Sequence, residues 1–490
     1  MQESRRLART MRSEPAAEMG EAAPTAGFGR FSLRRVMEGG LTAFVIYGLG
    51  IGLAYCSQLI VAYFVGIDAF GLYAYAVAWV VPLAYVAGLG FDIGLLRFLP
   101  VYGARGEWRR MKGILRYSQR QVALTGISIT VLGTVCVVAS HLPADRMMTF
   151  ILGFVMIPVL ALLRTRCAAI RGLGGVTWAI VPDRMVREGT LIVLVCGASL
   201  GLGVAVRAPH VMLAMLIATV IGLIVTVSAL RAQLPNSLTT EPSFSYDSEF
   251  WRRVTLPLLL IGAGEVLMNR IGVILLGWMA DNKSAGIYSL AFNIAMVVTL
   301  PRLALNTLFA PALASHCARD DRPAMQMLVT QTTVWTLVAA LAIGTILFAF
   351  ADKLLGLFGR DYGDGVTALR ILLVGQVIAA AAGPLLYVMT MSGYERGAAR
   401  LLVVFTCLTG IMSVCLIPAF GAIGASFAGT IGLILWSAAM SDFLWRYLGL
   451  VPGALASVTG RRGDESSGRV VGPKRGRTAL ANVFNNQRQK

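Results

Sequence analysis

The sequence predicts an all-α integral membrane protein with about twelve transmembrane helices, and three observations lead to this prediction. First, 57% of the 490 residues are hydrophobic and only 14% are charged, whereas soluble domains carry about 25% charged residues. Second, apolar runs of about 20 residues recur along the chain, each long enough to cross the hydrocarbon core as a helix. Third, the chain contains 53 glycines, and small residues let membrane helices approach closely.

The formal net charge of +18 is explained by a membrane rather than by nucleic acid. Most arginines stand beside apolar segments, where they set the topology and contact anionic lipid headgroups. No compact basic domain is present in the sequence that could hold a nucleic acid. We therefore expect membrane lipids, and no nucleic acid, among the partners.

The cysteines and histidines indicate neither a metal site nor a cofactor. The seven cysteines include no CxxC pair, and most lie in or next to apolar segments, as small buried hydrophobes do. The three histidines are far apart in the sequence, and no HExxH, Walker A or Rossmann pattern occurs. We expect no catalytic residue, no metal, no cofactor and no ATP hydrolysis by this chain.

Two polar tails and a polar linker divide the chain. Residues 1–38 form an Arg-rich tail without the features of a cleaved signal peptide, and residues 449–490 form a second basic tail. The linker at 231–253 separates a first half at 39–230 from a second half at 254–448. The candidate spans lie at about 41–65, 71–95, 117–140, 147–170, 178–203 and 210–230, and then at about 254–279, 285–311, 326–350, 366–391, 399–418 and 422–447.

The lysines and arginines of the short loops predict that both ends of the chain lie in the cytoplasm. Loops that follow even-numbered spans carry most of the basic residues, and loops that follow odd-numbered spans carry few. The expected inward loops hold Arg105, Arg109, Arg110, Lys112, Arg116, Arg164, Arg166, Arg171, Arg231, Arg252, Arg253, Arg319, Arg322, Arg396 and Arg400, and the expected outward loops hold Arg146, Arg207, Lys283, Lys353 and Arg360.

The two halves carry a similar motif after their first outward turn. Gly71-Leu-Tyr-Ala-Tyr-Ala76 in the first half corresponds to Gly286-Ile-Tyr-Ser-Leu-Ala291 in the second. Because each half has an even number of spans, both halves have the same orientation. This pattern indicates a parallel repeat about an axis along the membrane normal, which is typical of carriers.

Four stretches resemble one known superfamily of exporters. They are Tyr63-Phe-Val-Gly-Ile-Asp-Ala-Phe-Gly-Leu-Tyr73, Gly90-Phe-Asp-Ile-Gly-Leu-Leu-Arg-Phe-Leu-Pro100, Leu275-Leu-Gly-Trp through Ala291, and Leu416-Ile-Pro-Ala-Phe-Gly-Ala-Ile-Gly-Ala-Ser-Phe-Ala428. In order and spacing they resemble the multidrug/oligosaccharidyl-lipid/polysaccharide (MOP) exporter superfamily, specifically its bacterial polysaccharide-biosynthesis (Wzx-like) flippase branch. The resemblance covers roughly residues 40–445.

The resemblance implies two six-helix lobes around a central cavity, at 39–230 and 254–448, and an alternating-access cycle. It implies a polyprenyl-diphosphate-linked oligosaccharide as substrate, flipped across the cytoplasmic (inner) membrane of a bacterium for exopolysaccharide or lipopolysaccharide biosynthesis. Polysaccharide polymerase or export machinery would be a further partner. The sequence does not name the sugar repeat, the coupling ion or the oligomeric state.

Ionisable residues within the spans are the candidate substrate-binding residues. A charge at the bilayer centre costs about 2.5–3.5 kcal/mol on insertion scales, so it usually meets a partner or a wet cavity. Glu265 and Arg270 lie about 16 and 24 Å from the cytoplasmic end of span 7. The full candidate set is Arg270, Glu265, Arg187, Glu188 and Arg302.

These charges can be interpreted in two ways. Arginine guanidinium groups suit phosphate and carboxylate, so the set could line a cationic cavity for a diphosphate or an acidic sugar. Alternatively the charges pair internally, and Arg184 and Glu188, four residues apart on one helical face, would then be structural. For Asp92 and Arg97, near the inner surface, anchoring or snorkelling is the favoured interpretation.

Two other functions remain open from the sequence. A drug/cation antiporter of the same superfamily would need carboxylates deep in the membrane, and Glu188 and Glu265 are consistent with this alternative. A membrane-embedded polysaccharide polymerase or ligase would need a sizeable external loop with acid and base residues, and the longest outward loop, near 352–365, is short. Arginine is at least as common as glutamate among the deep charges, which favours an anionic substrate.

The loop charges lead to a test of orientation. Cysteine labels at Ser237 in the linker and Ser466 in the C-terminal tail should react only from the cytoplasmic side, because the basic loops stay inside. Accessibility of both sites to an impermeant thiol reagent in intact cells and in inverted vesicles measures this. Labelling of either site in intact cells would contradict the predicted topology.

Overall fold

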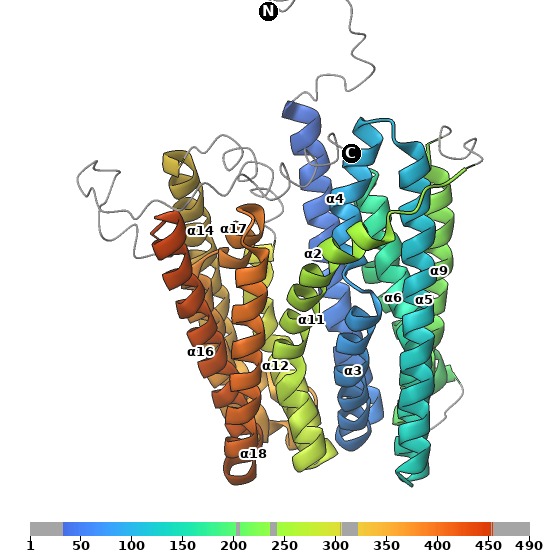
Figure 1. Cartoon of the computed structure of the whole chain (residues 1–490). Helices are drawn as coiled ribbons and strands as arrows, with labels where there is room; N and C mark the ends of the chain where they lie inside the picture. The colour runs from blue at the N-terminus through green and yellow to red at the C-terminus, as the bar shows by residue number, and fades with distance from the viewer. Residues whose placement is uncertain are drawn as a thin grey trace, which may run out of the picture. The chain divides into compact units, whose positions relative to one another are not determined.

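The computed structural model describes residues 33–201, 206–235, 243–303, 305, 322–451 and 453. Most of both predicted tails and the middle of the predicted linker lie outside these residues. Met1–Thr42 and Ala43–Lys490 form two separate compact units, and the second unit contains nearly all of the described residues. Those residues form helices and turns without a strand (Figure 1), which confirms the all-α prediction.

The first half contains the helices of the first six predicted spans. Its helices are α2 (Leu33–Val65), α3 (Ile67–Ala87), α4 (Phe91–Ala104), α5 (Trp108–Ala139), α6 (Ala144–Gly172), α7 (Val176–Val181), α8 (Arg187–Cys196) and α9 (Ala208–Gln233). Two π-helical turns, Pro182–Val186 and Gly197–Gly201, follow α7 and α8. A span that the sequence predicts as one helix at 178–203 is therefore a series of short helical pieces.

The second half contains long helices and short connecting pieces. Its helices are α11 (Ser248–Met279), α12 (Asn282–Met296), α14 (Arg322–Ala349), α15 (Ala351–Gly356), α16 (Val366–Ala382), α17 (Leu385–Met391) and α18 (Glu395–Leu448), with 3₁₀ turns at Val297–Thr299 and Arg360–Gly365. Asp281 caps the start of α12 by accepting a hydrogen bond from the Ser284 backbone N–H at 2.6 Å, and hydrogen bonds from Ser284 lower the pKa of Asp281.

The described helices provide the twelve predicted spans. Ten helical stretches are long and apolar enough to cross a membrane. One of them, α18, is 54 residues long, and Gly421 inside it has φ 53° and ψ −129°, so this stretch is two helices joined at a kink. The interrupted segment at 176–201 is not among the ten stretches; counted with them and with the divided α18, it brings the described helical segments to the twelve predicted.

Two ends of the bundle can be distinguished. The end at which α5 and α11 begin is called here the linker end, where the Ser245 backbone N–H donates to the Arg109 carbonyl at 3.1 Å. The end at which α6 and α12 begin is called the far end, where Arg146 donates to the Asn282 side chain at 2.9 Å. The predicted orientation would place the linker end in the cytoplasm.

The second span is longer than predicted and is broken in the middle. The sequence analysis expects it at 71–95, whereas α3 and α4 together cover 67–104. Leu89 and Gly90 both have positive φ, 50° and 74°, and separate the two helices. A side chain on Gly90 would collide with the Thr255 carbonyl of α11, so glycine serves both the turn and the close helix contact.

The two motifs of the predicted repeat meet each other at the far end, where α3 crosses α12. A Cβ atom on Gly71 would overlap the Asn282 carbonyl, and one on Gly286 would lie 3.0 Å from the Gly71 Cα. Two helices from different halves thus touch through their backbones at equivalent positions. This contact agrees with an approximate two-fold relation between the halves.

The glycine crossing leads to a test of packing. Gly71→Ala should lower the free energy of unfolding by about 1–3 kcal/mol, because the new methyl group meets backbone that cannot rotate away. The midpoint of thermal unfolding of the purified protein measures this. Gly48→Ala is the matched control, since a Cβ there has no neighbour within 4 Å. Equal melting of the two variants would contradict the tight crossing.

Candidate substrate cavity

A cavity of about 360 Å³ lies between the two halves of the chain. Helices α2, α3, α6, α8 and α9 of the first half form most of its wall, and α11 and α12 of the second half close it. Three of the five predicted site residues, Arg187, Glu188 and Arg270, line it. The structure therefore brings together charges from spans 5 and 7, which are far apart in the sequence.

One wall of the cavity is a hydrogen-bonded group of charges around Arg187. Its Nη1 donates to Asp183 Oδ1 at 2.7 Å, and its Nη2 and Nε donate to Glu188 Oε1 at 2.7 and 3.2 Å. The other oxygen of Glu188 accepts a hydrogen bond from the Ser57 hydroxyl of α2 at 2.5 Å. The three charged side chains are mostly buried, with exposures of 13%, 18% and 4% for Arg187, Asp183 and Glu188.

The π-helical turn explains how this wall forms. Pro182 lacks a backbone donor and cannot take part in a regular α-helical ladder, and the turn Pro182–Val186 widens at this point. The ion pair between Asp183 and Arg187 spans four residues, the spacing of neighbouring side chains on a helix. Arg184 lies 3.8 Å from the second oxygen of Asp183. The internal pairing considered for the deep charges is therefore found at Arg187 rather than at Arg184, because Arg187 and Ser57 take the Glu188 carboxylate.

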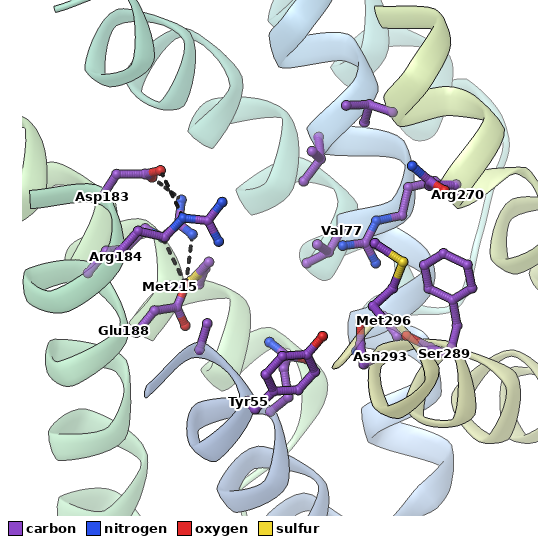
Figure 2. Close-up of a pocket in the computed structure, with 18 of the residues that line it drawn as sticks. Tyr55, Val77, Asp183, Arg184, Glu188, Met215, Arg270, Ser289, Asn293 and Met296 are labelled. Carbon is purple, nitrogen blue, oxygen red and sulfur yellow. Dashed lines mark hydrogen bonds and ion pairs between the residues drawn. The ribbon is translucent and has the colours of Figure 1, made fainter. Parts of the chain in front are cut away.

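Arg270 of α11 forms the opposite wall. Figure 2 shows its guanidinium across the cavity from Asp183, Arg184 and Glu188. Within the described part of the chain no carboxylate lies in ion-pair distance of Arg270, and the hydroxyl-bearing rings of Tyr55, Tyr73 and Tyr85 line the same cavity. Arg270 is thus a half-buried cation in the cavity wall without an acidic partner.

Uncharged polar groups complete the lining. Gln58, Ser289 and Asn293 contribute an amide, a hydroxyl and a second amide. The Tyr73 hydroxyl is buried and makes no hydrogen bond of acceptable geometry within the described residues, although Gln58 lies beside it. Such groups can orient a polar ligand in a cavity.

The charges and the neutral groups of the lining can be placed by depth. By helical rise, Tyr73 and Ser289 are each about 9–10 Å from the far-end start of their helices, α3 and α12. Arg164 is about 30 Å from the far-end start of α6, and its guanidinium covers the Tyr85 ring at 3.7 Å. Arg270, nine residues before the end of α11, is by the same measure about 14 Å from the far end, so the positive charge of the lining extends from the linker end to near the level of the neutral groups.

Glu265 and Arg302, the other two predicted site residues, do not line this cavity. They influence each other electrostatically, but no ion pair of 4 Å or less joins them in the part of the chain that the structure describes. Glu265 is exposed and Arg302 is half-buried. That either binds substrate stays a prediction, now without support from the cavity.

The sequence analysis missed three residues of the charged wall. Asp183 stands four residues before Arg187, and this spacing within a span could have identified it. Arg164 was assigned to a basic loop because it follows the apolar core of span 4. Ser57 has no signal in the sequence, since a serine within a membrane helix usually bonds its own backbone.

The helices and the cavity define a multi-pass membrane transporter, and solved structures with a similar fold are transporters. One is an inward-facing multidrug resistance MATE family transporter of the MOP superfamily, with TM-score 0.63, 16% identity and coverage of 82% of this chain and 93% of that one. Another is an outward-facing multidrug resistance MATE family transporter of the MOP superfamily, with TM-score 0.60, 16% identity and coverage of 82% of this chain and 94% of that one. A third is a mutant of a Vibrio cholerae MATE transporter, with TM-score 0.58, 14% identity and coverage of 88% of this chain and 98% of that one. At these identities the likeness establishes the fold alone.

The chain belongs to the polysaccharide biosynthesis protein family, whose family model matches residues 36–314. The MatE family model also matches residues 257–417. Together with the transporter fold, these matches place the chain in the MOP superfamily, as the sequence resemblance predicts. No curated protein matches the chain.

The paired wall leads to a test of structural roles. Glu188→Ala should lower the free energy of unfolding by about 1–3 kcal/mol, because Asp183 still balances the charge of Arg187 but Nε and Nη2 of this buried side chain lose their acceptor. Glu249→Ala is the matched control: it removes an exposed partner of Arg253, for which the expected loss is about 0–1 kcal/mol. Thermal unfolding of the purified variants gives both values. A Glu188 variant as stable as the control would contradict a structural role for the pair.

Proposed function

We propose that this protein flips a polyprenyl-diphosphate-linked oligosaccharide across the bacterial cytoplasmic membrane by alternating access. The observation that carries the proposal is the charge of the cavity lining, which holds four arginines and two carboxylates. The family supplies the biosynthetic context of exopolysaccharide or lipopolysaccharide. Membrane lipids surround the protein, and polysaccharide polymerase or export machinery would receive its product.

The charges fit a diphosphate diester. Arg164, Arg184, Arg187 and Arg270 against Asp183 and Glu188 leave a formal excess of two positive charges in the lining. A diphosphate that joins a sugar to a polyprenol carries two negative charges at neutral pH. Arg270 can donate a fork of two N–H groups to phosphate oxygens, because no acidic residue among the described ones occupies it.

The depth of the charges supports a direction of loading. Arg164 and Arg184 of the lining lie toward the linker end, which the loop charges predict to be cytoplasmic, and Arg187 and Arg270 continue the positive charge deeper into the cavity. Lipid-linked precursors made in the cytoplasm bring their diphosphate to that surface. The neutral amides and tyrosines farther in, among them Gln58, Tyr73 and Asn293, are groups that can hydrogen-bond to and pack against sugar rings.

The cavity does not favour a drug/cation antiporter. Both of its carboxylates are engaged, Asp183 by Arg187 and Glu188 by Arg187 and Ser57. A cationic drug would have to displace a paired guanidinium to reach either one. Glu265, the other carboxylate that kept this alternative open, lies outside the cavity lining.

Nor does the outward segment near 352–365 favour a polymerase or ligase. This segment consists of the short helix α15 and the 3₁₀ turn Arg360–Gly365. Two of its acidic side chains are used in ion pairs, Asp352 with Arg370 at 2.8 Å and Asp361 with Lys283 at 3.7 Å. These contacts explain the two carboxylates as structural groups of the loop.

The unpartnered cation leads to the test of function. Arg270→Ala should reduce polysaccharide export on the order of tenfold or more at normal protein abundance, because a charge-assisted hydrogen bond to phosphate is lost. Arg270→Lys should retain part of the activity, since it keeps the charge and loses the fork. Export is scored in a strain that lacks its own copy, with lipid-linked intermediates counted in each membrane leaflet.

A matched control is Arg253→Ala, which removes an exposed arginine at the linker end and should leave export unchanged. Lipid-linked intermediates should accumulate in the inner leaflet with Arg270→Ala only. Normal export by Arg270→Ala would remove Arg270 from the site. Absence of accumulation in the strain that lacks the protein would refute the proposed substrate.

A further inference from the structure

One ion pair joins the two halves of the chain directly at the linker end. Arg97 of α4 donates from Nη1 to Glu395 Oε1 at 2.6 Å, across 298 residues of sequence. The two side chains are 23% and 17% exposed, so water still reaches the pair. The sequence analysis expected Arg97 to anchor α4 at the surface, whereas the structure gives it a carboxylate in the opposite half.

Each partner of this pair is held firmly by its own half. On the Arg97 side, the neighbouring Phe98 and Leu99 are buried, and a Cβ on Gly172 of α6 would touch Leu99 at 3.1 Å. On the other side, Tyr394 precedes Glu395 and packs its ring against Phe443 at 5.6 Å. Relative movement of the halves therefore has to separate Arg97 from Glu395.

Glu395 is also placed where its charge is favoured. It is the first residue of α18, and a carboxylate in the first turn of a helix interacts well with the helix dipole. When Arg97 moves away, the carboxylate keeps this interaction and gains water. The pair can thus open without leaving a buried, uncompensated charge.

A second contact between the halves at the same end is of a different kind. Trp251 of α11 is fully buried, donates from Nε1 to the Tyr102 hydroxyl at 2.9 Å, and packs on Tyr117 at 5.4 Å. This apolar seam ties the beginning of α11 to α4 and α5. Farther along, α11 belongs to its own half, where a Cβ on Gly264 would touch Leu402 at 3.0 Å.

We propose that the Arg97–Glu395 ion pair is the latch of the linker-end gate. While it is formed, the start of α18 is held against α4 at the linker end, outside the lining of the cavity; when it breaks, α18 moves away from α4 and a path into the cavity opens there. The Trp251 seam stays closed in both states, and α11 bends beyond it, near Pro257, which already interrupts its hydrogen-bond ladder. This inference holds whatever the cargo is.

The latch is tested by the accessibility of a cysteine inside the cavity. The background variant has all native cysteines replaced, namely Cys56, Cys136, Cys167, Cys196, Cys317, Cys407 and Cys415. Ala54→Cys then reports on the cavity that Ala54 lines. An impermeant thiol reagent is applied to right-side-out and to inverted vesicles, and Arg252→Cys, exposed at the start of α11, shows which side is the linker end.

Arg97→Glu should speed labelling of Ala54→Cys from the linker end about fivefold or more, because loss of a water-exposed ion pair shifts the population toward the open state. Arg97→Gln should also speed this labelling, and it replaces Arg97→Glu as the test variant if the charge reversal lowers the abundance of the protein. Combining Arg97→Glu with Glu395→Arg should return the labelling rate toward that of the background.

The matched control breaks an ion pair within one half. Arg370→Glu removes the partner of Asp352, at 2.8 Å, and should leave the labelling rate unchanged. Unaltered labelling with both Arg97 variants would overturn the proposal, as would failure of the swapped pair to restore the rate. Equal acceleration by Arg370→Glu would also overturn it, since the effect would then be general loosening.

Discussion

A charge inside the hydrocarbon core must be paired or must face water, and the interior of this protein follows from that constraint. Arg187 satisfies it with Asp183 and Glu188, and Glu188 receives a further hydrogen bond from Ser57. These pairs build one wall and hold α2 against the interrupted fifth span. Arg270 satisfies the constraint in the other way, because it faces the cavity. Paired charges thus stabilise the wall, while Arg270, which has no acidic partner among the described residues, is available to a ligand.

The same apolar solvent offers helices no hydrophobic reason to associate, so close packing and polar contacts join the two halves. At the far end Gly71 and Gly286 bring two backbones together. At the linker end the contacts include the buried Trp251 seam and the water-exposed pair of Arg97 and Glu395. Separating a buried aromatic contact requires a different free energy from separating a water-exposed ion pair. In our proposal this difference decides which part of the interface opens during transport.

Hydropathy and loop charge predicted the all-α fold and the twelve spans, because the membrane imposes one length and one composition on each crossing. The internal motif predicted a repeat, and the structure adds that its glycines, Gly71 and Gly286, are a point of contact between the halves. Which side chains contact each other was harder to predict from the sequence. Arg187 and Glu188 are adjacent residues of α8, a spacing at which side chains do not normally face each other on a helix. The contact of Arg97 with Glu395 depends on packing between the halves. Depth alone placed Glu265 beside Arg270 as a candidate, although only Arg270 lines the cavity.

The central claim is that the cavity carries an anionic, lipid-linked glycan between leaflets. The most direct measurement uses purified protein in liposomes that contain a fluorescent short-chain polyprenyl diphosphate sugar, with an impermeant quencher added outside. The account predicts that quenching exceeds the half of the probe initially in the outer leaflet, and that a matched lipid with a cationic headgroup is not moved. Transport of the cationic lipid in place of the diphosphate would contradict the account.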